Sequence, residues 1–234
     1  MQTAVVNSSP HSLNGQSILA RVRAKIGMRL KKGFYARHLS YGLRRDLDIA
    51  FTPPTARIPI SIRPLADEDV PILFPADQSG LDDKEQLELN WRKSFLESSI
   101  GRCLVAVDER SGEPCYFQWL IGPDENARLA PLKMSHHLGD DEALLENAYT
   151  PLHYRSKGIM PAAMARIAEV ARESGLRYVT TFVGVENTPS LKGCIKAGFH
   201  RCLVRQQTNF AFDTIRLIHV RNMPPDDPQS VLNP

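Results

Sequence analysis

A short basic stretch with a central glycine is the part of this chain best suited to chemistry. Residues 154–160 read Tyr-Arg-Ser-Lys-Gly-Ile-Met. They follow a run that predicts a strand over 143–150 and precede an alanine-rich run that predicts a helix over 161–174. The first N–H groups of a helix have no partner within it, and the helix dipole favours negative charge there. The pattern predicts an anion site, with an ordinary solvated loop as the alternative.

A second helix start follows farther along the chain. Asn187-Thr-Pro-Ser190 predicts a helix that ends at Lys196-Ala-Gly-Phe199, after a run over 177–184 that predicts a strand. This order of strand, R-x-x-G loop, helix, strand and Asn-x-x-Ser helix resembles the GNAT superfamily of acyl-CoA-dependent N-acyltransferases. The resemblance is strong over 144–199 and looser from about 60 to 220.

The resemblance implies an α/β (α+β) fold with a central mixed, mostly antiparallel sheet flanked by helices. It also implies that a primary amine attacks acetyl-CoA or another acyl-CoA directly in a ternary complex, without a metal. The residues that it assigns to the acyl-CoA are Tyr149, Thr150, Arg155, Ser156, Lys157, Gly158, Ile159, Met160, Asn187 and Ser190. Met160 departs from the family, which usually has glycine or alanine there. Asn187 has a plain helix cap as its alternative role.

Two residues are candidates for proton transfer. Glu146 lies on the strand before the loop, where the family often has its base, and partial desolvation would raise the pKa of this carboxyl toward neutrality. Its alternative is an exposed glutamate at a strand edge, with Glu142 on the same side of the strand. Cys194 stands where family members often carry a tyrosine that protonates the leaving thiolate, and its alternative is a small buried hydrophobe. Loss of that tyrosine leaves open a second function, an acyl-CoA-binding or sensing protein without turnover.

The charge distribution divides the chain. The net charge is +3, but residues 1–57 carry ten basic and two acidic residues, whereas 58–234 carry nineteen basic and twenty-four acidic residues. We therefore expect a basic helical N-terminal arm over 1–57 and the acyltransferase domain over 58–222. The remaining residues, 223–234, contain four prolines, which predicts a disordered tail.

The arm predicts a helix over 16–41, because apolar residues recur at every fourth position from Ile18 to Phe34. One interpretation packs this stripe on the domain or on a second subunit, which makes a homodimer one of the expectations. A second places residues 16–45 on an anionic membrane, where basic residues are attracted to the lipid headgroups. Organellar targeting is a third, and nucleic-acid binding is disfavoured because no recognition motif is present.

Other patterns complete the expected domain. Leu87, Trp91 and Phe95 are spaced at fours within one of the expected helices. The expected elements are a strand over 60–65, helices over 68–73 and 83–97, a hairpin of 104–108 with 115–121, and a closing antiparallel pair of 201–209 with 213–220.

The four cysteines show no CxxC pair and no His-Cys spacing typical of a metal site. We expect reduced thiols and a cytoplasmic protein, since no apolar run approaches the length of a membrane span. The expected partner is a small-molecule amine, whose identity the fold alone does not choose.

Overall fold

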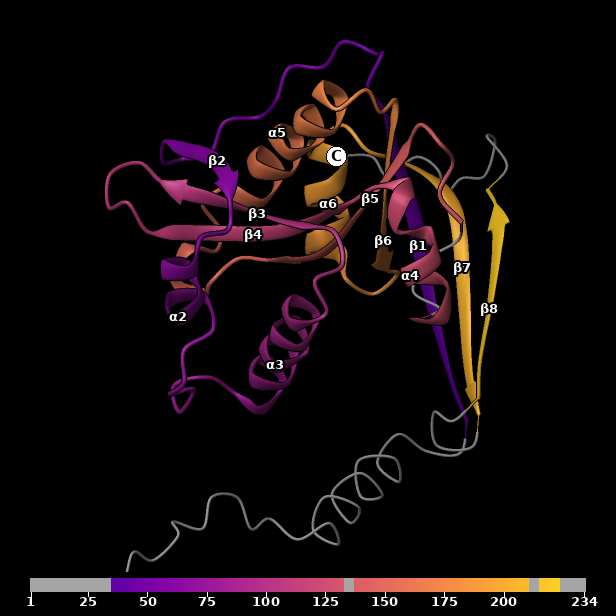
Figure 1. Ribbon diagram of the computed structural model, residues 1–234, viewed down its shortest axis with the longest axis horizontal. Coiled ribbons are helices and arrows are strands. Elements are labelled where there is room, and N and C mark those ends of the chain that lie inside the picture. Colours follow the sequence, from indigo (N-terminus) through magenta and orange to yellow (C-terminus); the bar gives the residue numbers. More distant parts are fainter. Residues whose placement is uncertain (1–34, 133–136, 211–214, 224–234) are drawn as a thin grey trace, which may run out of the picture. The chain divides into compact units, whose positions relative to one another are not determined.

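The described residues of this computed structural model are 35–132, 137–210 and 215–223, and they include an eight-stranded sheet (Figure 1). The strands lie in the order β2-β3-β4-β5-β6-β1-β7-β8. Their bounds are β1 Tyr35–Asp46, β2 Ile60–Pro64, β3 Arg102–Asp108, β4 Pro114–Ile121, β5 Glu142–Tyr149, β6 Tyr178–Gly184, β7 His200–Phe210 and β8 Ile215–Asn222. β5 and β6 pair in parallel, whereas β2–β3, β3–β4, β4–β5 and β1–β6 are antiparallel. The expected mixed, mostly antiparallel sheet is confirmed.

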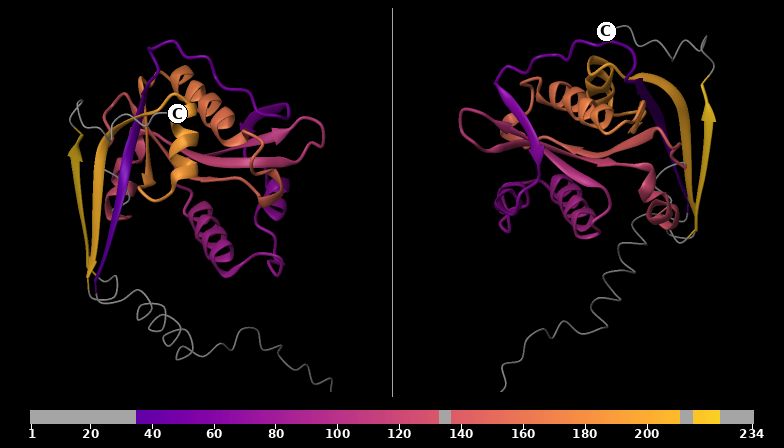
Figure 2. Two further views of the ribbon diagram at one scale, coloured as in Figure 1. Left: turned by 180° about the vertical axis from the view of Figure 1, so that it is seen from behind. Right: turned by 45° about the horizontal axis from the view of Figure 1, so that its top comes forward.

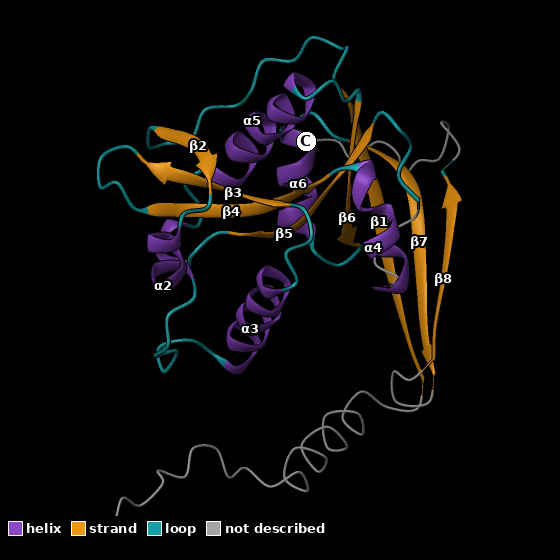
Figure 3. Cartoon of the chain, in the orientation of Figure 1, coloured by secondary structure: helices purple, strands orange, loops and turns teal. Residues whose placement is uncertain are grey.

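Helices and short helical turns connect the strands (Figure 3). The helices are α2 Val70–Leu73, α3 Asp83–Glu97, α4 Asn126–Leu129, α5 Ile159–Glu173 and α6 Thr188–Lys196. The 3-10 turns are η1 Asp67–Asp69, η2 Pro123–Glu125, η3 Ala130–Leu132 and η4 Leu152–Tyr154. No described helix combines the length and apolarity that crossing a membrane requires.

The chain divides into two compact units. The larger contains His38–Gln207 and Ile218–Pro234, and the smaller contains Met1–Arg37 and Thr208–Leu217. The described residues of the smaller unit are the end residues of β1, β7 and β8. The site described below lies within the larger unit.

Alternating side chains of the sheet belong to two hydrophobic cores, one on each face. On β4, Tyr116 and Leu120 belong to the core that contains the buried residues of α5 and α6, whereas Phe117 and Trp119 belong to the core beneath α3. This is the period-two alternation of a strand covered on both sides. The helices accordingly lie on opposite faces of the sheet, α5 and α6 on one and α3 on the other (Figure 2).

α5 lies against the sheet because its inward face is small. Ala162, Ala163, Ala165, Ala168 and Ala171 are all fully buried. Alanine has no side chain beyond Cβ and is the best helix former, so it permits both a stable helix and a close approach of the backbone to the strands. This packing fixes where the N-terminus of α5 lies relative to the end of β5.

The sequence expectation was wrong for residues 35–46, which form strand β1 and not the end of a helical arm. β1 pairs with β6 from Ser40↔Gly184 to Asp46↔Tyr178, so the domain begins before residue 58. Tyr41, Leu43 and Arg45, at every second position, are all buried, which is the pattern of a strand and not of a helix. The earlier part of the arm and residues 224–234 lie outside the described residues.

Burial of a charge is the physical reason that this strand was missed. Arg45 is 2% exposed, and its guanidinium pairs with Glu169 of α5 and donates to the carbonyl oxygen of Ala165. A sequence reading treats such an arginine as solvated, since arginine is rarely buried without a partner. The proposed membrane contact of residues 16–45 therefore cannot use Arg45.

Candidate active site

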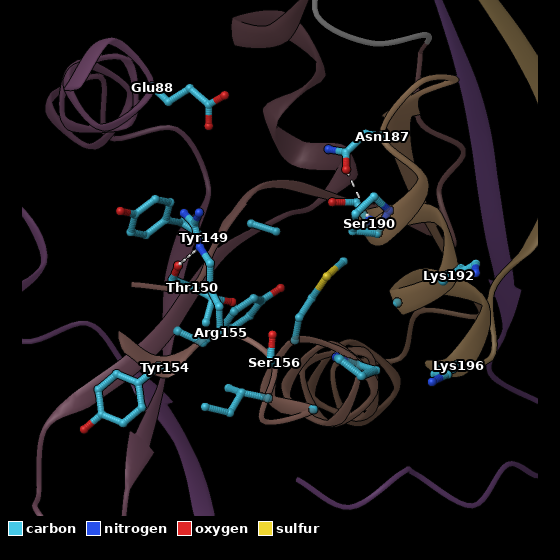
Figure 4. A pocket seen from close by; sticks show the side chains of 18 of the residues that line it. Glu88, Tyr149, Thr150, Tyr154, Arg155, Ser156, Asn187, Ser190, Lys192 and Lys196 are labelled. Atoms are coloured by element: carbon cyan, nitrogen blue, oxygen red, sulfur yellow. Dashed lines mark hydrogen bonds between the residues drawn. The ribbon is translucent and has the colours of Figure 1, made fainter. Parts of the chain in front are cut away.

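The end of β5, the loop that follows it and the starts of α5 and α6 enclose a cavity of about 700 Å³ (Figure 4). α3 closes the cavity from the other side, through Glu85, Glu88 and Arg92. Nine of the twelve expected site residues line it: Tyr149, Thr150, Arg155, Ser156, Gly158, Ile159, Met160, Asn187 and Ser190. Lys157, Glu146 and Cys194 are not part of the lining.

The loop that opens the cavity has an unusual backbone. Ser156 and Gly158 have positive φ values of 63° and 72°, and Gly158 is the N-cap residue of α5. A Cβ on Gly158 would meet only ordinary contacts, the nearest being the carbonyl oxygen of Thr55 at 3.6 Å. The left-handed conformation, and not crowding within the protein, is therefore what favours glycine here.

The positive end of the α5 dipole is not neutralised by side chains of its own first turn. No side chain caps it, and its first turn contains no acidic residue. The first N–H groups of a 15-residue helix and its dipole consequently face the cavity lined by Gly158, Ile159 and Met160. This is the arrangement that binds phosphate at many helix starts.

Arg155 does not offer a free charge to this site. Its guanidinium forms an ion pair with Glu85 of α3, with Nη1–Oε1 at 2.8 Å and Nη2 donating to Oε2 at 2.9 Å. Its Nε also donates to the carbonyl oxygen of Thr150. Glu85 raises the pKa of Arg155, and Arg155 lowers the pKa of Glu85. The expectation that Arg155 simply adds positive charge for a phosphate is thus incomplete.

Lys157 also lies differently from the expectation. Its Nζ sits 4.8 Å from the centre of the Tyr154 ring, and its carbonyl oxygen accepts a hydrogen bond from the N–H of Arg57. Segment 47–59, which connects β1 and β2, therefore holds the loop from outside. Lys157 therefore helps to hold the loop in place, and it does not line the cavity.

The positive charge comes instead from α6 and α3. Lys192 and Lys196 lie one turn apart on α6, and both line the cavity (Figure 4). With Lys84, Arg92 and Arg155 they make five basic side chains in the lining, against the two carboxylates of Glu85 and Glu88. The sequence reading missed the two lysines, although their spacing of four after the Asn187 helix start was a usable signal.

Asn187 serves as the cap of α6 and also lines the cavity. Its Oδ1 accepts a hydrogen bond from the N–H of Ser190 at 3.2 Å. Both alternatives that the sequence left open are therefore compatible at this residue.

Met160 of α5 and Gly193 of α6 pack against each other. A Cβ built on Gly193 would lie 2.8 Å from Sδ of Met160 and 3.2 Å from its Cε. Methionine at a position where the related pattern has a small residue is thus accommodated because α6 has no side chain opposite it. Both residues line the cavity.

A bulge in β5 interrupts its pairing with β4 beside the cavity. Phe117 of β4 pairs with Tyr149, but Trp119 pairs with Glu146, so β5 has one extra residue. Asn147, within the bulge, has a positive φ of 57°. The parallel pairing of β5 with β6 covers Glu142–Leu145, and the segment that lines the cavity lies beyond it.

Glu146 faces the α3 side of the sheet, because directly paired residues share a face and its partner Trp119 packs with Phe95 of α3. Burial raises the pKa of Glu146 to about 7, with Arg205 and Arg92 lowering it in part. A carboxyl that titrates near neutrality is suited to accept a proton.

Cys194 lies in the core beneath α6 and is 1% exposed. Burial raises the pKa of its thiol to about 12. Because it is outside the cavity lining, the structure favours the alternative role of a small buried hydrophobe. Three tyrosines line the cavity, and the hydroxyl of each is engaged: Tyr116 with Gln118, Tyr149 with Glu85 and Tyr154 with Ser111. Among the described residues, no group of three or more His, Cys, Asp or Glu is placed to hold a metal ion.

The sequence matches no protein-family model, and no curated protein is significantly similar to it. Solved structures do resemble the fold. They include the GCN5-related glucosamine N-acetyltransferase region of a fungal multi-domain GH3 β-N-acetylglucosaminidase, with a TM-score of 0.50 at 16% identity over 82% of this chain and 23% of that one. A GCN5-related N-acetyltransferase from Sphaerobacter thermophilus has a TM-score of 0.44 at 16% identity over 92% of this chain and 60% of that one. A GNAT-family acetyltransferase from Colwellia psychrerythraea has a TM-score of 0.48 at 12% identity over 82% of this chain and 74% of that one.

The chain thus spans about 60% of the length of the Sphaerobacter protein and 23% of the fungal one. At these identities the likeness concerns the fold. The parallel β5–β6 pair, the bulge beside it and the helix that starts at the end of β5 are all observed directly. Taken with the match to the fungal region, whose TM-score is 0.50, they show that this chain has the fold of the GCN5-related N-acetyltransferases (GNAT).

Proposed function

We propose that the protein transfers an acetyl or longer acyl group from acyl-CoA to a primary amine. The observation that carries this proposal is the uncapped, acid-free N-terminus of α5, which opens on a cavity with five basic side chains. Coenzyme A presents a pyrophosphate and a further phosphate, so its recognition needs both N–H donors and cations. The fold supports acyl transfer in general, and the donor and acceptor are the finer parts of this proposal.

The residues divide the work along the cavity. The first turn of α5 and Ser156 would bind the pyrophosphate, with Lys192 and Lys196 supplying charge beside it. The end of β5 at Tyr149 and Thr150 would hold the pantetheine arm, and Asn187 faces the same space. The acyl carbon would then lie near the β5 bulge, where backbone N–H groups stabilise the oxyanion.

Glu146 would accept the proton of the attacking amine, directly or through a water molecule. The amine must be neutral to attack, and a carboxylate with a pKa of about 7 is largely ionised at slightly alkaline pH. With Cys194 buried, the thiolate of coenzyme A would leave without a cysteine donor.

Calorimetric titration with acetyl-CoA, octanoyl-CoA and free coenzyme A tests the donor site. We expect micromolar binding that Gly158→Trp abolishes, because tryptophan is strained in the left-handed conformation of Gly158 and would distort the backbone at the start of α5. Retained affinity in this variant would remove the loop from the proposal. Circular dichroism of the variant controls for loss of fold.

A second function remains supported by one observation, the absence of Cys194 from the cavity. A binding or sensing protein would hold acyl-CoA without turnover. Release of free thiol, measured across a panel of primary amines, separates the two. Binding without thiol release would favour the sensor.

A further inference from the structure

Two apolar side chains of α3 are uncovered beside the cavity. Leu87 is 67% exposed and Trp91 is 52% exposed, whereas Phe95, the third residue of the same spacing, is 4% exposed. We propose that Leu87 and Trp91 form the acceptor wall, and that the amine acylated is carried on an apolar body, either aromatic or branched aliphatic. This inference rests on the proposed function and specifies the acceptor class.

Position on the helix places this wall at the rim of the cavity. Glu88 and Arg92 line the cavity, and each lies one residue after Leu87 or Trp91. A step of about 100° separates consecutive helical residues, so Leu87 and Trp91 share a stripe next to the lining stripe. A ligand that extends out of the cavity over α3 would meet these two side chains first.

Trp91 is held against the reacting end of the site. Its indole Nε1 donates to Oδ1 of Asn147 at 3.1 Å, in the bulge of β5. Ala148, the next residue, lines the cavity, and Glu146, the residue before, has the carboxyl that titrates near neutrality. The apolar wall and the proton acceptor therefore meet at the same three-residue segment.

The same bulge contains a buried amide group that no described residue satisfies. Nδ2 of Asn147 is buried and has no hydrogen-bond partner among the described residues. A buried polar group without a partner costs stability unless a ligand satisfies it. Because Trp91 donates to Oδ1 of this amide, the indole and the bulge are held in one relative orientation.

Charge on the rim fits an amine. Glu88 has a 42% exposed side chain, and its contact with Arg92 is long at 3.4 Å. Glu85, in contrast, is engaged by Arg155 at 2.8 Å. Glu88 is therefore the carboxylate better placed to attract an incoming ammonium, and the face of the Trp91 ring attracts cations as well.

The wall also excludes a class of acceptors. An amine on a polyhydroxylated body would place hydroxyl groups against Leu87 and Trp91, which offer them no hydrogen-bond acceptor at the apolar surface. Polar groups that lose water without gaining a partner weaken binding. An apolar body instead gains from covering the two side chains.

Steady-state kinetics with acetyl-CoA and two primary amines test the inference. The amines are 2-phenylethylamine, which has an aromatic body, and ethanolamine, which has a polar one. We expect the wild-type kcat/KM to favour 2-phenylethylamine by about a hundredfold. Trp91→Ala should lower kcat/KM for 2-phenylethylamine by about tenfold, equivalent to about 1.4 kcal/mol, and change that for ethanolamine by less than about twofold.

Ile72→Ala is the matched control. Ile72 on α2 is 53% exposed, much like Trp91, and it does not line the cavity. This variant should leave both kcat/KM values unchanged. Leu87→Ala should show the same selective loss as Trp91→Ala, at about threefold.

Intrinsic fluorescence gives a readout that does not require turnover. The chain has two tryptophans, and Trp119 is 1% exposed, so changes in solvent exposure report mainly on Trp91. With free coenzyme A bound, 2-phenylethylamine should shift the emission to shorter wavelength, and Trp91→Ala should abolish the shift. Ethanolamine should leave the emission unchanged.

Three results would overturn the inference. They are equal kcat/KM values for the two amines, a uniform loss for both in Trp91→Ala, and coenzyme A binding without turnover or fluorescence response to 2-phenylethylamine. Each leaves the donor site of the proposed function standing. Failure of the wild-type protein to bind coenzyme A in calorimetry would instead remove the proposed function, and this inference with it.

Discussion

Replacing Glu85 with glutamine should strengthen the binding of coenzyme A. In the structure Glu85 holds Arg155 through two short contacts of 2.8 and 2.9 Å, and Arg155 lines the cavity in which the phosphates would lie. A phosphate that recruits Arg155 must first displace this carboxylate. Glutamine keeps the shape of the side chain and removes its charge.

The magnitude follows from the exposure of the pair. Arg155 is 41% exposed and Glu85 is 15% exposed at the side chain, so solvent screens the interaction substantially. Exposed ion pairs contribute up to about 1 kcal/mol, and the two-pronged geometry puts this pair at the upper end of that range. Release of about 1 kcal/mol corresponds to a dissociation constant that is about fivefold lower.

Isothermal titration calorimetry with free coenzyme A measures the effect at two salt concentrations. The gain should shrink at high salt, because screening weakens both the ion pair and the phosphate contact. Glu88→Gln is the control, since Glu88 also lines the cavity but contacts Arg92 and not Arg155. Equal tightening in both variants would show that only net charge matters, and unchanged or weaker binding in Glu85→Gln would refute the role of the pair.

Three further predictions concern other residues of the site. The wild-type rate should rise with pH through a midpoint near 7 and then level off, because protonated Glu146 cannot accept a proton; Glu146→Gln should remove this rise, lower kcat about a hundredfold and leave coenzyme A affinity within about twofold. A pH–rate profile that survives the substitution would assign the base elsewhere. Lys192→Ala with Lys196→Ala should weaken coenzyme A about tenfold in calorimetry yet leave acetylpantetheine, which lacks the phosphates, unaffected; equal losses for both ligands would contradict a phosphate role. Cys194→Ala should lower the free energy of unfolding by about 1 kcal/mol in urea titrations without changing kcat, and a large fall in kcat at unchanged stability would restore Cys194 as an acid.

Local patterns predicted well the helices and strands that surround the cavity. The loop, the two helix starts and the strands before them are all short-range features, because capping residues, glycine and apolar periodicity act over a few residues. The structure places α5 at Ile159–Glu173 and α6 at Thr188–Lys196, close to the expected ranges. The position of Glu146 on the strand before the loop likewise follows from alternation alone.

The partners of these residues could not be read from the sequence. Glu85 and Arg155 are 70 positions apart, and Met160 and Gly193 are 33 apart, so only the packed fold brings each pair together. Arg155, which the sequence suggests is a free cation, is therefore paired with Glu85 in the structure. Gly193 likewise turns the departure at Met160 from a misfit into a packed contact.

The helical reading of residues 35–41 failed for a related reason. The apolar stripe at fours ends at Phe34, and the competing period of two that follows it becomes decisive only when β6 is available as a partner. Arg45 strengthened the wrong reading, because its partner Glu169 is remote in sequence. Pairing with the remote strand β6 outweighs the local helical pattern in this segment.

The position of β1 in the sheet also affects how the chain folds. β1 lies between β6 and β7, and Asp46 is paired with Tyr178, so the strand at the start of the described chain is completed by strands made more than a hundred residues later. During synthesis both edges of β1 stay unpaired until β6 and β7 have been made. Closing so long a loop is slow, because the chain loses entropy before any contact forms. Arg37, Arg44 and Arg45 place charge along this waiting strand, which discourages pairing with other chains. The same residues that looked like a solvated basic arm thus suit a strand whose folding is necessarily late.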